Sequence, residues 1–96
     1  IGCALDMDTR KVYFYKNGSA LYGGVGVDLP STTGAYLFAT GDWWGSVATQ
    51  STANFGNGYF GTTAVASAGT NASGIGIFEY DVPTGYTALS TKGLNL

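Results

Sequence analysis

The dipeptide Asn17-Gly18 is the feature that most constrains how this chain folds. Asn-Gly tolerates positive φ at both central positions of a tight turn, so it favours a β-hairpin between two strands. Before the dipeptide, Val12 and Phe14 alternate with Tyr13 and Tyr15. This period of two is typical of a strand. The sequence therefore predicts a strand that ends at this turn.

Other stretches repeat the pattern of short strands between turns. Alternating or apolar runs predict strands over 1–7, 35–40, 46–55, 77–82 and 86–89. Turn residues separate them at 8–10, 28–30 and 83–85. The stretch 57–76 has few apolar anchors and predicts a long surface loop with at most one short strand. Loops of that length are uncommon unless they make contacts or are mobile.

The composition agrees with an all-β domain. Sixteen Gly and fourteen aromatic residues (seven Tyr, five Phe, two Trp) suit short strands and tight turns, and no helix is required anywhere. Ninety-six residues allow one domain, 1–96, with a modest core. The only cysteine, Cys3, cannot form a disulfide within the chain, and its alternating position predicts a small buried hydrophobe rather than a reactive thiol.

Charge and hydropathy narrow the set of partners. A net charge of −2 with four basic residues makes nucleic acid an unlikely ligand, because a phosphate backbone needs many cations. No apolar run approaches the roughly 18 residues of a membrane helix. The chain begins at Ile1 inside a strand-like pattern, so we expect a processed product or a piece of a longer polypeptide.

Catalytic chemistry has little support in the sequence. Histidine, the commonest general base at neutral pH, is absent, and no glycine run forms a phosphate-binding motif. Two carboxylate pairs, Asp6/Asp8 and Glu79/Asp81, have the spacing that places both groups on one strand face, as a glycosidase or a cation site would need. Turn capping and solvated strand faces explain them more simply. We expect no cofactor and no metal.

Trp43 and Trp44 are the sharpest candidate for a binding site. Adjacent tryptophans between glycines cannot both face one core, so at least one is expected at the surface, against a sugar or a protein partner. The alternative is that one packs over the end of the domain and the other against a neighbouring subunit. Two sequons, 17–19 and 71–73, match the N-glycosylation acceptor pattern, which occurs often by chance in such a sequence.

Three stretches resemble the SPRY family. "IGCALDMDTRKVYFYKNG" resembles its strand–turn–strand segment, "ANFGNGYF" its Asn-Phe-Gly stretch, and "FEYDVPTGYTALSTKGLN" its closing segment. The closing segment and the Gly/Ser/Thr/Asn-rich stretch before it look most like the SPRY-type modules of bacteriophage virion proteins. Two departures stand out. Arg10 stands where the family often has Gly, which requires another turn geometry or an unfavourable φ, and the strands that normally precede Ile-Gly are absent.

The resemblance implies an antiparallel, jelly-roll-type β-sandwich without catalytic activity, of which this chain is the C-terminal two-thirds. It implies a structural or binding role in an oligomeric virion assembly: a fibre, tail appendage or capsid decoration that contacts a host protein, a glycan or a neighbouring subunit. We expect contacts through Trp43, Trp44, Tyr59 and Phe60. The expected core residues are Leu5, Phe14, Phe38, Phe55 and Phe78. The alternatives are a cellular SPRY-type module that recognises a peptide or protein, and a glycan-cleaving enzyme using the carboxylate pairs.

Overall fold

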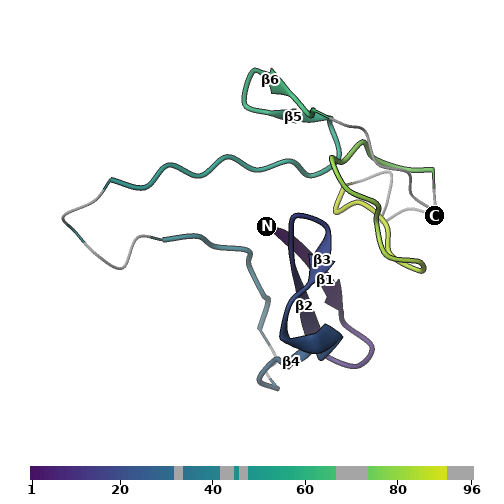
Figure 1. The fold of residues 1–96 in the computed structure, drawn as a ribbon. Coiled ribbons are helices and arrows are strands. Elements are labelled where there is room, and N and C mark those ends of the chain that lie inside the picture. Colours follow the sequence, from purple (N-terminus) through teal and green to yellow (C-terminus); the bar gives the residue numbers. More distant parts are fainter. Residues whose placement is uncertain (32–33, 42–44, 46–47, 67–73, 91–96) are drawn as a thin grey trace.

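The fold is built from short antiparallel strands (Figure 1). The computed structural model describes residues 1–31, 34–41, 45, 48–66 and 74–90. Within them the strands are β1 (Gly2–Asp6), β2 (Lys11–Lys16), β3 (Ser19–Ala20), β4 (Val27–Asp28), β5 (Tyr59–Phe60) and β6 (Thr63–Ala64). A 3-10 turn, η1 (Tyr22–Gly24), joins β3 to β4, and none of the described residues is in an α-helix. The all-β prediction is confirmed.

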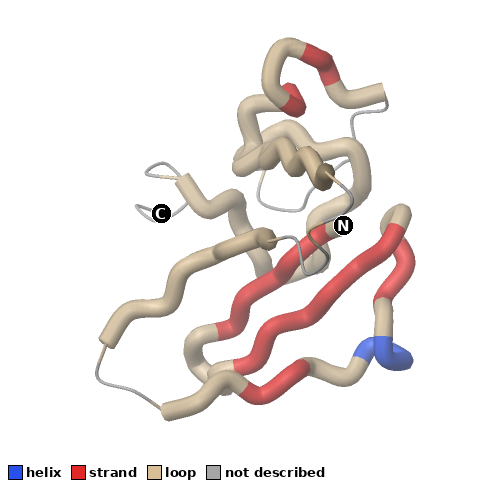
Figure 2. The backbone as a smooth tube through the Cα atoms, turned by 90° about the vertical axis from the view of Figure 1, so that its left-hand side faces the viewer, coloured by secondary structure: helices blue, strands red, loops and turns tan. Residues whose placement is uncertain are grey.

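The main sheet is organised around β2. One edge of β2 pairs with β1, and the other pairs with β3 near its end and with β4 near its start. Leu5 lies opposite Val12 and Cys3 opposite Phe14, so these four side chains share one face, as the alternation predicts. Figure 2 shows β1 and β2 side by side, with the short β3 and β4 at opposite ends of the other edge of β2.

Turns with clear sequence signals lie at the two ends of β2. Asn17 and Gly18 have φ of 50° and 80°, and β2 pairs with β3 directly across them, so the predicted turn is confirmed. At the other end, Asp6 Oδ1 accepts hydrogen bonds from the backbone N–H groups of Asp8 and Thr9 at 2.9 and 3.2 Å. Arg10 has a φ of 55°, the left-handed conformation in which glycine is favoured.

The strands predicted after residue 34 do not form ladders. Segments 35–40, 48–55, 78–82 and 86–89 have no strand pairing, and Ile77 makes only an isolated parallel bridge with Asn57. The strands predicted for these segments are therefore not confirmed, because a strand forms only where a partner lies alongside. The predicted loop 57–76 contains the small β5–β6 hairpin, two short strands rather than one; residues 67–73 lie outside the described part.

The core differs from the predicted one. Among the described residues, the buried hydrophobic side chains are those of Ala4, Val12, Ile75 and Ala88. Of the five expected core residues, Phe38 and Phe55 are exposed, while Leu5, Phe14 and Phe78 are half-buried. Cys3 is exposed as well, so its prediction as a buried residue is wrong. None of the expected large residues is fully buried, and Ala88 lies where the backbones of Gly56 and Gly76 approach closely.

The chain is also less compact than its length suggests. Its radius of gyration is 14.3 Å, whereas about 12.5 Å is typical of a folded chain of this length. Figure 1 shows the reason: segments 34–41 and 48–53 are two legs of a long arm that leads away from the sheet. The base of the arm is held by a tilted contact between Phe38 and Phe55, whose ring centroids are 6.5 Å apart.

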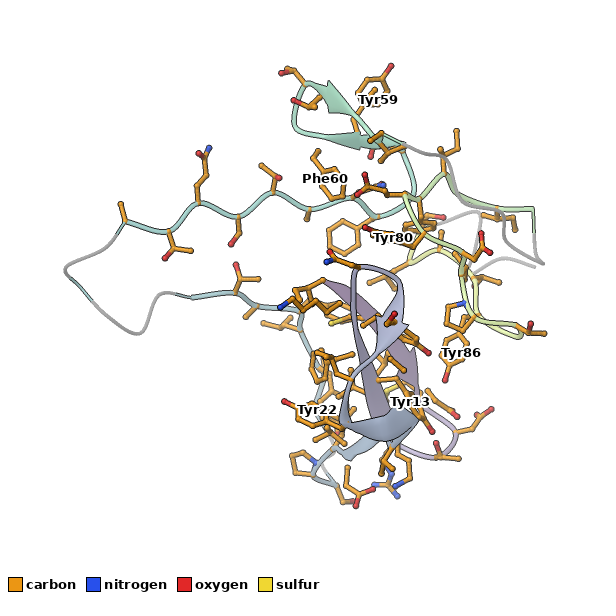
Figure 3. All side chains as sticks on the ribbon, in the orientation of Figure 1. Tyr13, Tyr22, Tyr59, Phe60, Tyr80 and Tyr86 are labelled. Atoms are coloured by element: carbon orange, nitrogen blue, oxygen red, sulfur yellow. The ribbon has the colours of Figure 1, made fainter. Side chains whose placement is uncertain are left out.

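The C-terminal segment, residues 75–90, packs against the hairpin. A Cβ built on Gly18 would lie 2.8 Å from the Tyr80 ring, so this ring covers the Asn-Gly turn. Burial raises the pKa of the Tyr86 phenol, and the nearby charges of Asp6, Tyr13 and Tyr15 add to the rise. Tyr86 therefore lies beside the face that carries Tyr13 and Tyr15, and Figure 3 shows it at that side of the sheet.

The turn at Arg10 gives a direct test of backbone strain. Replacing Arg10 by Gly removes the strain of a positive φ, whereas Arg10→Ala keeps it. Both variants lose the same hydrogen bond from Arg10 Nη1 to Ser31 Oγ. We expect Arg10→Gly to be more stable than Arg10→Ala by about 1 kcal/mol in urea unfolding. Equal stabilities, or a more stable alanine variant, would contradict the left-handed conformation.

Candidate contact surface

Of the four predicted contact residues, the structure describes Tyr59 and Phe60. Trp43 and Trp44 lie outside the described residues. Tyr59 and Phe60 form β5, and successive strand residues point to opposite faces. Tyr59 is 48% exposed and Phe60 is half-buried. In Figure 3 Tyr59 lies on the outer side of the hairpin, and Phe60 faces the rest of the molecule. Tyr59 is thus available to a partner, whereas Phe60 packs within the fold.

Asn54 organises the chain next to this hairpin. Its Oδ1 accepts hydrogen bonds from the backbone N–H of Gly56 at 2.7 Å and of Gly58 at 3.3 Å. Its Nδ2 donates to the carbonyl of Ile77 at 2.9 Å. One side chain therefore closes the loop that follows it and ties that loop to the C-terminal segment. The backbone N–H of Ile77 donates to Gly56 O at 2.9 Å and reinforces the same connection.

Three small residues meet behind this loop. A Cβ on Gly76 would lie 2.9 Å from the Cβ of Ala88 and 3.3 Å from the Cα of Gly56, and a Cβ on Gly56 would lie 3.1 Å from Ala88 Cβ. Both glycines have positive φ, 116° for Gly56 and 89° for Gly76. No side chain fits at either position, so the two backbones approach as closely as glycine allows.

An open hollow of about 460 Å³ lies against this contact, and Gly56, Gly76 and Ala88 are among its lining residues. It is lined by residues 53, 55–57, 75–76, 88 and 90. The walls are mostly apolar, with the exposed Phe55 ring on one side and Ile75 on another. None of the lining residues has a titratable side chain. Such a hollow can accept an apolar group of a partner, but it brings no general acid or base to it.

Two of the carboxylates, those of Asp6 and Asp28, make structural contacts. Hydrogen bonds from the backbone of Thr9 and Asp8 lower the pKa of the Asp6 carboxyl, as expected for a side chain that caps a turn. Asp28 forms an ion pair with Lys11 at 2.5 Å across the β2–β4 ladder, and this bond raises the pKa of the Lys11 ammonium. The capping role predicted for Asp6 is confirmed.

The described residues give little support for a metal site, a reactive thiol or a membrane-spanning helix. In the described part of the chain, no three His, Cys, Asp or Glu residues come together as metal ligands. Shielding from water raises the pKa of the Cys3 thiol, which lowers the fraction of reactive thiolate. The sequon at Asn17 falls in the exposed hairpin turn, and the one at Asn71 lies outside the described residues. The described residues include no helix of the length and hydropathy that membrane spanning requires.

Comparison with known proteins adds no relative. No family model, no curated protein and no solved structure matches this chain.

Sequence reasoning missed Asn54 and the contact among Gly56, Gly76 and Ala88. The signal for Asn54 is present in the sequence: Asn54-Phe55-Gly56 has an Asn two residues before a backbone donor, the spacing of an Asx turn. The bond from Asn54 to Ile77 and the contact of Gly56 with Gly76 have no such signal, since they join segments about twenty residues apart.

Replacing Asn54 by Ala should destabilise the domain more than the same change at Asn57. Asn54→Ala leaves three backbone groups without their partner, so we expect a loss of about 2 kcal/mol in the free energy of unfolding. Asn57 accepts one long bond from Tyr59 N at 3.3 Å, and we expect Asn57→Ala to cost less than about 1 kcal/mol. Equal midpoints of urea unfolding for the two variants would contradict the organising role of Asn54.

Proposed function

We propose that this chain is a non-enzymatic β-sandwich module of SPRY type, and that it serves as a structural and binding part of a bacteriophage or related virion. In this role it belongs to a fibre, a tail appendage or a capsid decoration at the particle surface. It contacts a host protein, a glycan or a neighbouring subunit.

The observation that carries the proposal is the meeting of the three resembling stretches. The closing segment supplies Tyr80, whose ring covers Gly18 of the strand–turn–strand segment, and Tyr86, which Figure 3 shows on the side of the sheet near Tyr13. The same segment supplies Ala88, which packs on Gly56 of the Asn-Phe-Gly stretch. Motifs far apart in the sequence thus form one contact region, as expected if they belong to one folding unit.

The layering supports the sandwich part of the proposal. In Figure 1 the main sheet lies between the C-terminal segment on one side and segment 34–41 on the other. In the described part of the chain neither flanking segment is assigned to a strand, and Ile77 makes an isolated bridge with Asn57. In a complete sandwich the flanking segments would pair with further strands and form the second sheet.

Exposed apolar groups favour binding over catalysis. Phe55 and Tyr59 are about half exposed, and Phe55 borders a hollow whose walls have no titratable group. Aromatic side chains at the surface are typical anchors for protein and sugar partners, because one rigid ring buries a large area. Trp43 and Trp44, which lie outside the described residues, are two further aromatic candidates in the sequence.

Purified particles provide the test of a virion role. Particles from a culture that encodes the chain are separated on a density gradient, and an antibody raised against residues 1–96 is used for blotting and electron microscopy. We expect the antibody to label the particle band and the particle surface. Recovery of the chain only in the soluble cell fraction would overturn the virion role and favour the cellular module instead.

The contact role is tested by Tyr59→Ala and by the double variant Trp43→Ala/Trp44→Ala. If these aromatics face the host, particle numbers stay normal and adsorption to cells falls at least tenfold; if they face a neighbouring subunit, assembly falls instead. Phe60→Ala is the control, because its ring is half-buried and its loss should lower the melting temperature. Normal assembly and adsorption for both aromatic variants would contradict the proposed contact.

A further inference from the structure

The outer edge of β1 has no partner strand in the described part of the chain. β2 is paired along both edges, whereas β1 pairs only with β2. An edge strand of this kind presents a row of backbone N–H and C=O groups that another strand can bind.

The ladder shows which backbone groups face that edge. The carbonyl of Phe14 accepts a hydrogen bond from Leu21 N, and the carbonyl of Arg10 accepts one from Leu29 N. In an antiparallel ladder a residue directs its N–H and C=O to the same side, and this side alternates along the strand. Phe14 therefore bonds toward β3 and not toward Cys3 opposite it. It follows that Cys3 and Leu5 direct their N–H and C=O groups to the free edge.

This edge carries none of the usual protection against pairing. Between Gly2 and Asp6 there is no Lys, no Pro and no bulge, and the only charge stands at the end of the strand. Around it, Ile1 is 87% exposed and Met7 is 51% exposed. Soluble proteins seldom leave an apolar edge open to water, because such edges associate.

The sequence of β1 is complementary to itself. In an antiparallel pair centred on Ala4, Cys3 lies opposite Leu5 of the second copy and Ile1 opposite its Met7, which gives an apolar stripe on one face. On the other face Asp6 lies opposite Gly2, so the carboxylates of the two copies are kept apart. Cys3 and Leu5 are also the residues whose backbone groups point outward, so both can form hydrogen-bonded pairs in this register.

We propose that the β1 edge is an interface between two copies of this chain, with the two β1 strands paired antiparallel about a twofold axis at Ala4. The pairing joins two sheets into one continuous sheet, and each copy contributes the same patch. It follows from the geometry of β1 and does not depend on a role in a virion.

Sedimentation equilibrium of the 96-residue chain, with reductant present, tests this pairing. We expect a reversible monomer–dimer equilibrium. Cys3→Pro removes an N–H that faces the free edge and leaves the β1–β2 bonds in place, so it should weaken the dimer at least tenfold. Cys3→Ser keeps that N–H and should dimerise like the wild type, which also shows that no disulfide is involved. A chain that stays monomeric at millimolar concentration, or equal dimerisation of the proline variant, would overturn the proposal.

Hydrogen exchange identifies the edge independently of any variant. In the monomer the amides of Cys3 and Leu5 should exchange rapidly, while that of Ala4, which bonds to β2, is slow. Raising the protein concentration should protect Cys3 and Leu5 at least tenfold and leave Ala4 unchanged. If the amides of Cys3 and Leu5 are protected at every concentration, another segment of the same chain covers the edge. If they exchange rapidly at every concentration, no second copy binds there. Either result overturns the proposal.

Discussion

The packing of the C-terminal segment on the hairpin is the contact on which the rest of the structure depends. Tyr80 covers the turn at Gly18, Tyr86 lies beside the tyrosine face of β2, and Ala88 fits between Gly56 and Gly76. A single stretch of about ten residues thus joins the main sheet to the loop held by Asn54. A small sheet such as β1–β4 needs packing on a face for independent stability, and the C-terminal segment supplies part of that packing.

Local chemistry was predictable from the sequence, and long-range pairing was not. Three local features have direct sequence signals because they depend on neighbouring residues: the turn at Asn17-Gly18, the cap at Asp6 and the turn at 83–85. A hydrogen bond from Tyr86 N to Pro83 O at 3.1 Å closes the last of these turns. The apolar run 35–40 predicts a strand, yet a strand also needs a partner that no local pattern can specify. The same limit hid the core, where Ala88 is buried because two glycines far apart in the sequence meet there.

The candidate contact surface and the β1 edge have different physical characters. The hollow near Phe55 and the exposed Tyr59 offer side chains, which select a partner by shape and by aromatic stacking. The β1 edge offers backbone groups, which select an extended strand of matching register. A module with both surfaces can bind a partner through one and assemble through the other. This combination suits the proposed place in an oligomeric particle.

A double-mutant cycle between Gly18 and Tyr80 tests most directly whether the C-terminal segment packs on the hairpin. Gly18→Ala adds a methyl group 2.8 Å from the Tyr80 ring at a φ of 80°, whereas Gly24→Ala has the same φ with nothing within 4 Å. We predict that Gly18→Ala costs more than Gly24→Ala in urea unfolding, and that the excess, about 1 kcal/mol, disappears in the Tyr80→Ala background. An unchanged cost of Gly18→Ala in that background would show that Tyr80 does not lie over the turn, and would contradict the account.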